Sequence, residues 1–111
     1  MSYEFERAAY RIPYPPSARP RLMLGDREVP LVDCSERGLR FTTEGVPHPS
    51  VGSRISGRVH LLSGGPALAV EGTVIRCQEG EVAVRLKAPG IPVRAVFAEQ
   101  RFLGQRFPAR R

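Results

Sequence analysis

The sequence predicts an all-β fold: a small six-stranded antiparallel β-barrel of split or Greek-key-like topology, with a flexible N-terminal arm and a C-terminal helix. Its length of 111 residues fits one domain with one modest hydrophobic core. Short segments of alternating apolar and polar residues, each bounded by turn residues, are typical of strands, and helical spacing recurs only near the C-terminus. Because such strands would leave exposed edges in an open sheet, we expect them to close into a barrel.

The arm comes first. Its sequence is charged at the start and then rich in proline, a composition that forms neither one continuous helix nor a central strand. We expect the arm to span residues 1–20, the barrel with its helix to span residues 21–104, and a basic tail to span residues 105–111.

Six strands are expected in the barrel, at residues 21–24, 28–32, 39–43, 54–62, 67–76 and 81–87. The first two form a hairpin around the Gly25-Asp26 turn, and the Ser-Gly-Gly-Pro sequence at 63–66 is the hairpin loop before the fifth. The clearest half-buried pattern is in the last strand, where alternate positions are apolar: Val82, Val84 and Leu86.

A helix is predicted after the last strand. Pro92 suits a first helical position, and Gly104 offers a stop. Between them, apolar residues recur at near-helical spacing: Val93, Val96, Phe97 and Leu103. We therefore expect an amphipathic helix that covers one side or end of the sheet.

Composition limits the class of protein. The net charge is +6, and Lys87 is the only lysine. Arginine presents a planar fork that binds phosphate through two hydrogen bonds and stacks on rings, which suits a nucleotide or nucleic-acid partner. No apolar run approaches the roughly 20 residues that span a bilayer, and the N-terminus lacks a secretion-signal layout, so we expect a cytoplasmic protein. Cys34 and Cys77 lack metal-ligand spacing and indicate two reduced thiols.

Two arginines of the arm, Arg7 and Arg11, are separated by three residues. On one helical turn they would share a face, and in an irregular arm both can converge on one ligand. Two guanidinium groups offer forked donors for a phosphate and flat surfaces for a purine. Taken alone, the pair is better explained as solvated side chains, as clusters of basic residues usually are.

Segment 33–38 follows an expected strand and contains Asp33, Ser35 and Gly38. The aspartate and serine can bond their own backbone in a tight turn, while glycine supplies a positive φ or permits close backbone approach. A carboxylate and a hydroxyl that face a groove can also pair with the ring N–H and amino group of guanine, which arginine cannot do. By itself the segment is either an ordinary turn or part of a purine site.

Together, Arg-x-x-x-Arg in an N-terminal arm and Asp-x-Ser-x-x-Gly after a strand resemble the signature of PilZ domains. These are small β-barrels that bind the bacterial second messenger cyclic di-GMP. The resemblance implies that Arg7 and Arg11 grip phosphate and guanine. It also implies that Asp33, Ser35 and Gly38 line a guanine pocket, and the later strands and the helix follow the family's pattern as well.

Three further residues refine this expectation. Arg37 and Arg40 are additional candidates for ligand contact. Glu6 stands where some members resembling this chain carry a further arginine and hold a doubled ligand. Because its negative charge disfavours a second dianion, we expect one ligand molecule per chain.

The resemblance implies a receptor, not an enzyme. Its arm would fold over the ligand and signal to an unidentified protein effector that controls motility, pili or biofilm. His48 and His60 have no metal or triad partners nearby in the sequence, and neither a nucleophile elbow nor a glycine loop with lysine is present. We therefore expect neither catalysis nor a metal, and no cofactor apart from the ligand cyclic di-GMP.

Two alternatives stay open. One is a small basic barrel that binds single-stranded nucleic acid through a groove with aromatic platforms, against which stands an aromatic content of only 7%. The other is a protein-interaction module that works without ligand. The intact arginine pair and the Asp-Ser-Gly turn argue against it.

Overall fold

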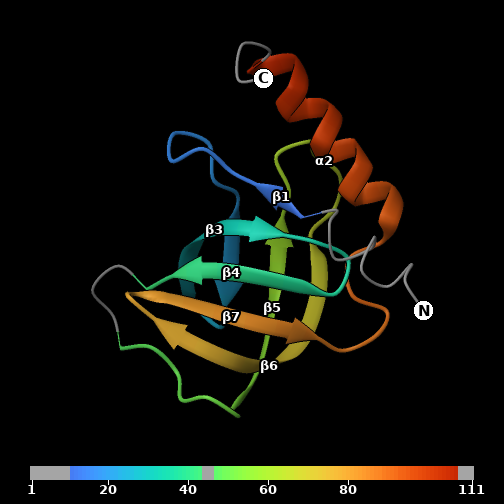
Figure 1. The fold of residues 1–111 in the computed structure, drawn as a ribbon. Coiled ribbons are helices and arrows are strands. Elements are labelled where there is room, and N and C mark those ends of the chain that lie inside the picture. Colours follow the sequence, from blue (N-terminus) through green and yellow to red (C-terminus); the bar gives the residue numbers. More distant parts are fainter. Residues whose placement is uncertain (1–10, 44–46, 108–111) are drawn as a thin grey trace, which may run out of the picture.

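A computed structural model describes residues 11–43 and 47–107 of the chain. Within these residues seven strands are followed by one helix (Figure 1). The elements are β1 (Ile12–Pro13), β2 (Arg21–Leu24), β3 (Arg27–Cys34), β4 (Gly38–Thr42), β5 (Arg54–His60), β6 (Leu68–Gln78), β7 (Glu81–Leu86) and α2 (Val93–Arg106).

Six of these strands close into an antiparallel barrel. Their order is β3-β2-β5-β6-β7-β4, and β4 also pairs with β3, which joins the two ends of the sheet. The additional strand β1 pairs with the end of β3, placing Ile12 opposite Cys34 and Pro13 opposite Asp33. The start of β3 pairs with β2, so β1 and β2 follow each other along one edge of β3. The predicted fold class is confirmed.

The observed strands differ little from those predicted. Every predicted boundary lies within two residues of the observed one, and the turn at Gly25-Asp26 is present. Strand β1 was not predicted, because proline at position 13 argues against a strand in the arm. A proline is tolerated there since β1 is a short edge strand. Residues 1–10 of the predicted arm lie outside the described residues.

The prediction that Gly104 ends the helix is wrong, because α2 continues to Arg106. Gly104 is not among the glycines with positive φ, so it does not form a left-handed cap. Arg106 lies over the Phe102 ring, 4.9 Å from its centroid, and a cation in the last turn is favourable. The N–H of Phe107 then donates to the Leu103 carbonyl oxygen at 2.8 Å. Two residues of the predicted tail therefore belong to the helix.

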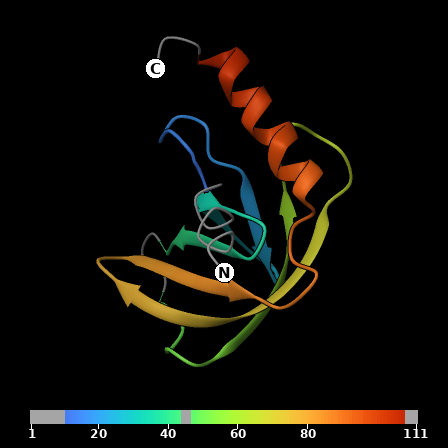
Figure 2. The ribbon, with the colours of Figure 1, turned by 45° about the vertical axis from the view of Figure 1, so that its right-hand side comes forward.

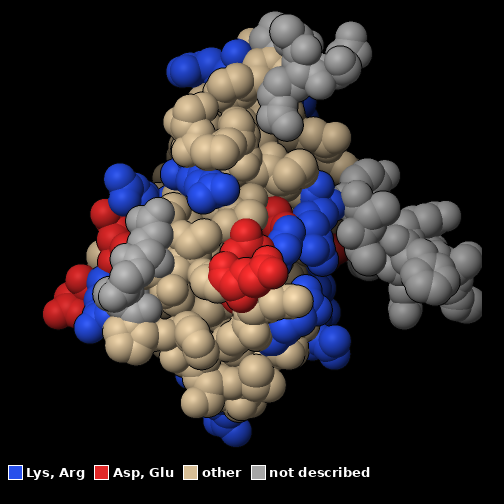
Figure 3. All heavy atoms as spheres, turned by 60° about the vertical axis from the view of Figure 1, so that its left-hand side comes forward, with Lys and Arg blue, Asp and Glu red and all other residues tan. Residues whose placement is uncertain are grey.

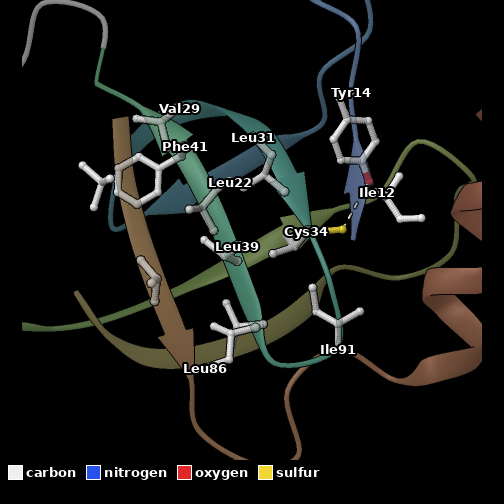
Figure 4. Close-up of a cluster of buried hydrophobic side chains, with 14 of the residues drawn as sticks. Ile12, Tyr14, Leu22, Val29, Leu31, Cys34, Leu39, Phe41, Leu86 and Ile91 are labelled. Atoms are coloured by element: carbon white, nitrogen blue, oxygen red, sulfur yellow. Dashed lines mark hydrogen bonds between the residues drawn. The ribbon is translucent and has the colours of Figure 1, made fainter. Parts of the chain in front are cut away.

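The core fills the barrel with side chains from several strands (Figure 4). Leu22, Leu31, Phe41 and Leu86, from β2, β3, β4 and β7, are each at most 1% exposed. Burying a side chain of this kind stabilises the fold by about 1.5–3 kcal/mol. Ile91, in the connector between β7 and α2, is also fully buried. The connector is thus packed against the barrel core.

Helix α2 lies at the end of the barrel where β1 and the β5–β6 loop also lie (Figures 1 and 2). The predicted apolar face is correct in part: Val96 is buried and Leu103 packs against the core. Val93 and Phe97 are instead 43% and 37% exposed. The buried face of α2 includes Glu99, which a pattern of apolar residues could not indicate.

Candidate ligand-binding site

The turn between β3 and β4 is held from two sides. Within it, the N–H of Ser35 donates to the Gly38 carbonyl oxygen at 2.8 Å, and Ser35 Oγ donates to the same oxygen at 3.3 Å. From outside, the N–H of Ile91 donates to the Glu36 carbonyl oxygen at 2.8 Å. Gly90 lies against that carbonyl with a φ of +71°, where a side chain would collide with Glu36. The predicted turn is present, and the connector to α2 holds it in place.

Gly38 is a glycine that the backbone does not require. Its φ is not positive, and a Cβ would lie 3.5 Å from both Ser35 Oγ and the Val84 carbonyl oxygen, an ordinary contact distance. The predicted positive φ is therefore wrong, and the backbone approach is too loose to exclude a methyl group. A Cβ would instead take up space beside a cavity that Gly38 lines.

Asp33, near the end of β3, has a side chain that is only 3% exposed. Its Oδ2 accepts hydrogen bonds from Arg40, from Nε at 2.8 Å and also from Nη2. Nη1 of Arg11 lies 3.8 Å from the same oxygen. Arg40 also donates from Nη1 to Glu81 Oε1 at 3.1 Å. The carboxylate of Asp33 raises the pKa of Arg40, which therefore stays charged and fixes the carboxylate.

A cavity of about 440 Å³ opens at this turn, a size usual for a small-molecule site. It is lined by every predicted site residue that the structure describes: Arg11, Asp33, Ser35, Arg37, Gly38 and Arg40. The pairing of β1 with the end of β3 brings the arm to the turn. Arg7 and Glu6 lie outside the described residues.

Five lining residues come from β6 and β7 and were not predicted as site residues: Ile75, Arg76, Ala83, Val84 and Arg85. Alternation along β7 already places Ala83 and Arg85 on the face opposite Val82 and Val84. The register then sets Ala83 and Arg85 opposite Arg40 and Gly38 on β4. A signal for their outward position was therefore in the sequence, but the neighbour they face follows only from the strand pairing.

Ile75 lies on the outward face of β6, in line with Glu71 and Thr73, at a point where the strand is irregular. The register of β6 with β7 shifts between Val74 and Arg76, so Ile75 has no residue opposite. Val74 is 1% exposed, whereas Ile75 is 43% exposed. Ile75 adds an exposed apolar side chain to a wall that also carries arginines.

Arginine dominates the charge at the cavity. Five guanidinium groups line it, beside the carboxylates of Asp33 and Glu36. A second cavity of about 630 Å³ shares Arg37 and Arg85 with the first. On the face shown in Figure 3, carboxylates lie beside basic side chains. An anion that enters the first cavity therefore meets more positive than negative groups.

Other kinds of site find less support among the residues that the structure describes. In residues 11–43 and 47–107, no group of three or more histidine, cysteine, aspartate or glutamate side chains could hold a metal ion. His48 is exposed, and its Nδ1 lies 3.2 Å from the Pro49 carbonyl oxygen. Over the same ranges, no helix is long and apolar enough to cross a membrane.

Comparison with known proteins identifies a family and similar solved structures. The family model of the PilZ domain matches residues 5–102. No curated protein matches the sequence. A crystal structure of an uncharacterized Legionella protein is similar, with a TM-score of 0.56 at 12% sequence identity, covering 86% of this chain and 96% of that one. At this identity the similarity concerns the fold.

Proposed function

Because this chain belongs to the PilZ domain family, we propose that it binds cyclic di-GMP in the cavity at the β3–β4 turn and signals to a protein partner. PilZ domains are ligand-binding receptor domains and not enzymes. One observation carries the proposal: the arginine of the arm and the Asp-Ser-Gly turn, which lie apart in the sequence, line the same arginine-rich cavity.

In this proposal the exposed arginines bind the phosphates of the ligand. Arg11 has a side chain that is 49% exposed, and its distance of 3.8 Å from Asp33 leaves guanidinium donors available. Charge-assisted hydrogen bonds from such a fork to a phosphate are strong and directional. Arg76 and Arg85 add positive charge from the opposite wall. Arg40 differs, since its donors already serve Asp33 and Glu81.

In this proposal the guanine base binds at the turn between β3 and β4. A carboxylate accepts from the ring N–H and the amino group, and Asp33 is held in place for this by Arg40. Ser35 offers a hydroxyl, and Gly38 leaves room for the base. Ile75 supplies an apolar surface for one side of a ring.

The arm supplies the switch in this proposal. Arg7 joins Arg11 on the ligand, and the arm changes its conformation when the ligand binds. A protein effector that controls motility, pili or biofilm reads the altered surface, in the cytoplasm. Glu6 keeps the stoichiometry at one ligand molecule per chain.

Calorimetric titration with cyclic di-GMP tests the proposal. The wild-type protein should bind saturably, with one ligand per chain. Arg11→Ala removes hydrogen bonds to a charged group, which costs about 1.5–3 kcal/mol and so weakens binding tenfold or more. Arg27→Ala is the matched control, because Arg27 is exposed and lies six residues before Asp33 on β3, about 20 Å along the strand. Its affinity should equal that of the wild type.

Equal affinities of Arg11→Ala and Arg27→Ala would contradict the site assignment. If wild-type protein binds oligonucleotides with a steep salt dependence but no cyclic di-GMP, the single-stranded nucleic-acid alternative replaces the proposal. If it binds neither, the module works through protein contacts alone.

A further inference from the structure

Glu99 on α2 is a fully buried carboxylate, with an exposed fraction of 0%. Its Oε2 accepts from the hydroxyl of Tyr14 at 2.6 Å and from the N–H of Leu62 at 2.9 Å. Its Oε1 accepts from the N–H of Ser63 at 2.9 Å. Three donors satisfy a charge that would otherwise be costly to bury. Glu99 thus ties the helix both to the loop after β5 and to the residue that follows β1.

The hydroxyl of Tyr14 donates its only proton to Glu99. Its side chain lies near Cys34 and Ile12 (Figure 4). Because its single hydroxyl proton goes to Glu99, the thiol of Cys34, 3.5 Å away, is the donor between those two. Burial raises the pKa of Tyr14 far above its usual range, so the hydroxyl keeps its proton.

The position of Tyr14 decides where Arg11 lies. Strand β1 is two residues long, and a strand of that length is held weakly by its own backbone pairs. Ile12 and Tyr14 are 4% and 5% exposed and point inward, so Arg11 and Pro13 occupy the outward face. About 10 Å of extended chain separates Arg11 from Tyr14. A displacement of Tyr14 therefore shifts the guanidinium of Arg11 relative to Asp33.

We propose that Glu99 is a positioning residue for the ligand site: through Tyr14 it holds the end of β1, and it thereby sets the approach of Arg11 to Asp33. The identity of the ligand in this inference rests on the proposed function. Its consequence is reciprocal, because a ligand that fixes Arg11 also strengthens the hold on α2. Helix α2 then responds to a ligand that it does not touch.

Two substitutions interrupt the contact, and a third serves as control. Tyr14→Phe removes one hydroxyl and leaves both loop N–H groups with the carboxylate, so it retains most of the native contacts. Glu99→Gln keeps the shape of the side chain but replaces one acceptor oxygen with a donor. Val96→Ala, at a position 3% exposed on the same helix, loosens packing and leaves the Tyr14–Glu99 contact intact.

Two measurements separate positioning from stability. Hydrogen exchange follows the N–H of Tyr14, which donates to the Val32 carbonyl oxygen at 3.0 Å. We expect about tenfold faster exchange in Tyr14→Phe and Glu99→Gln, but not in Val96→Ala. Calorimetry with cyclic di-GMP should show affinity reduced about threefold to thirtyfold in the same two variants, with normal binding by the control.

The outcomes decide between the two proposals. Exchange and affinity that match the Val96→Ala control would overturn the role of Glu99, as would faster exchange with unchanged affinity. If Glu99→Gln does not fold, Tyr14→Phe alone decides. If the wild-type protein binds no cyclic di-GMP, the proposed function fails, and the exchange rate at Tyr14 still tests whether Glu99 holds β1.

Discussion

The substitution Gly38→Ala separates what the fold needs from what the ligand needs. The φ of Gly38 is not positive, and a Cβ would meet Ser35 Oγ and the Val84 carbonyl oxygen at 3.5 Å. Alanine fits that geometry, and replacing glycine reduces the conformational freedom of the unfolded chain. The free energy of unfolding should therefore stay the same or rise by up to about 1 kcal/mol.

Ligand affinity should move in the opposite direction. The added methyl group takes up space at the cavity that Gly38 lines. Crowding of this kind in a close-packed contact costs about 1–3 kcal/mol, which corresponds to about fivefold to 150-fold weaker binding. The matched control is Gly104→Ala on α2, where nothing lies within 4 Å of the new Cβ. It should gain stability and bind normally.

Urea unfolding followed by circular dichroism gives the stability, and calorimetry with cyclic di-GMP gives the affinity. A loss of more than about 1 kcal/mol in Gly38→Ala would mean that the turn itself demands glycine, against the geometry. Unchanged affinity would mean that the ligand does not approach the backbone at this position.

Two further predictions concern the cysteines and high pH. Cys77 is partly exposed and should react with a thiol reagent in the native protein, while Cys34, 1% exposed, should react only after unfolding; two fast thiols would refute this. Burial raises the pKa of Cys34 from 9.0 to about 12, so the native state keeps a proton that the unfolded state loses. Stability should then fall between about pH 9 and pH 12, by up to about 4 kcal/mol, and alkaline unfolding of Cys34→Ala should show a shallower fall.

The strands could be predicted because their residues alternate and their turns contain glycine. In β7, Val82 and Val84 face the core, as the period of two requires. The motif residues were found by their types and order, before any contact was visible. The alternation and the motif are both local in the sequence. Such local patterns are enough to indicate which residues face the core and which face a groove.

The features that the sequence did not indicate depend on contacts between segments that are distant in the chain. Arg85 lines the cavity because β7 pairs with β4, and one strand does not specify its neighbour. Glu99 is buried where donors from Tyr14, just after β1, and from the β5–β6 loop meet it, whereas the apolar pattern favoured Phe97. The contact of Arg40 with Asp33 was also not indicated, since Asp33 lies on the adjacent strand.

The irregularity of β6 at Ile75 has a consequence for divergence within a family. In a regular strand each residue has a partner directly opposite on the neighbouring strand. A substitution is then constrained by the side chain of that partner. Ile75 has no residue opposite, while Val74 beside it keeps its place in the core. Mutations at this position can accumulate without loss of the barrel. Related receptors can thus acquire different ligand preferences on an unchanged scaffold.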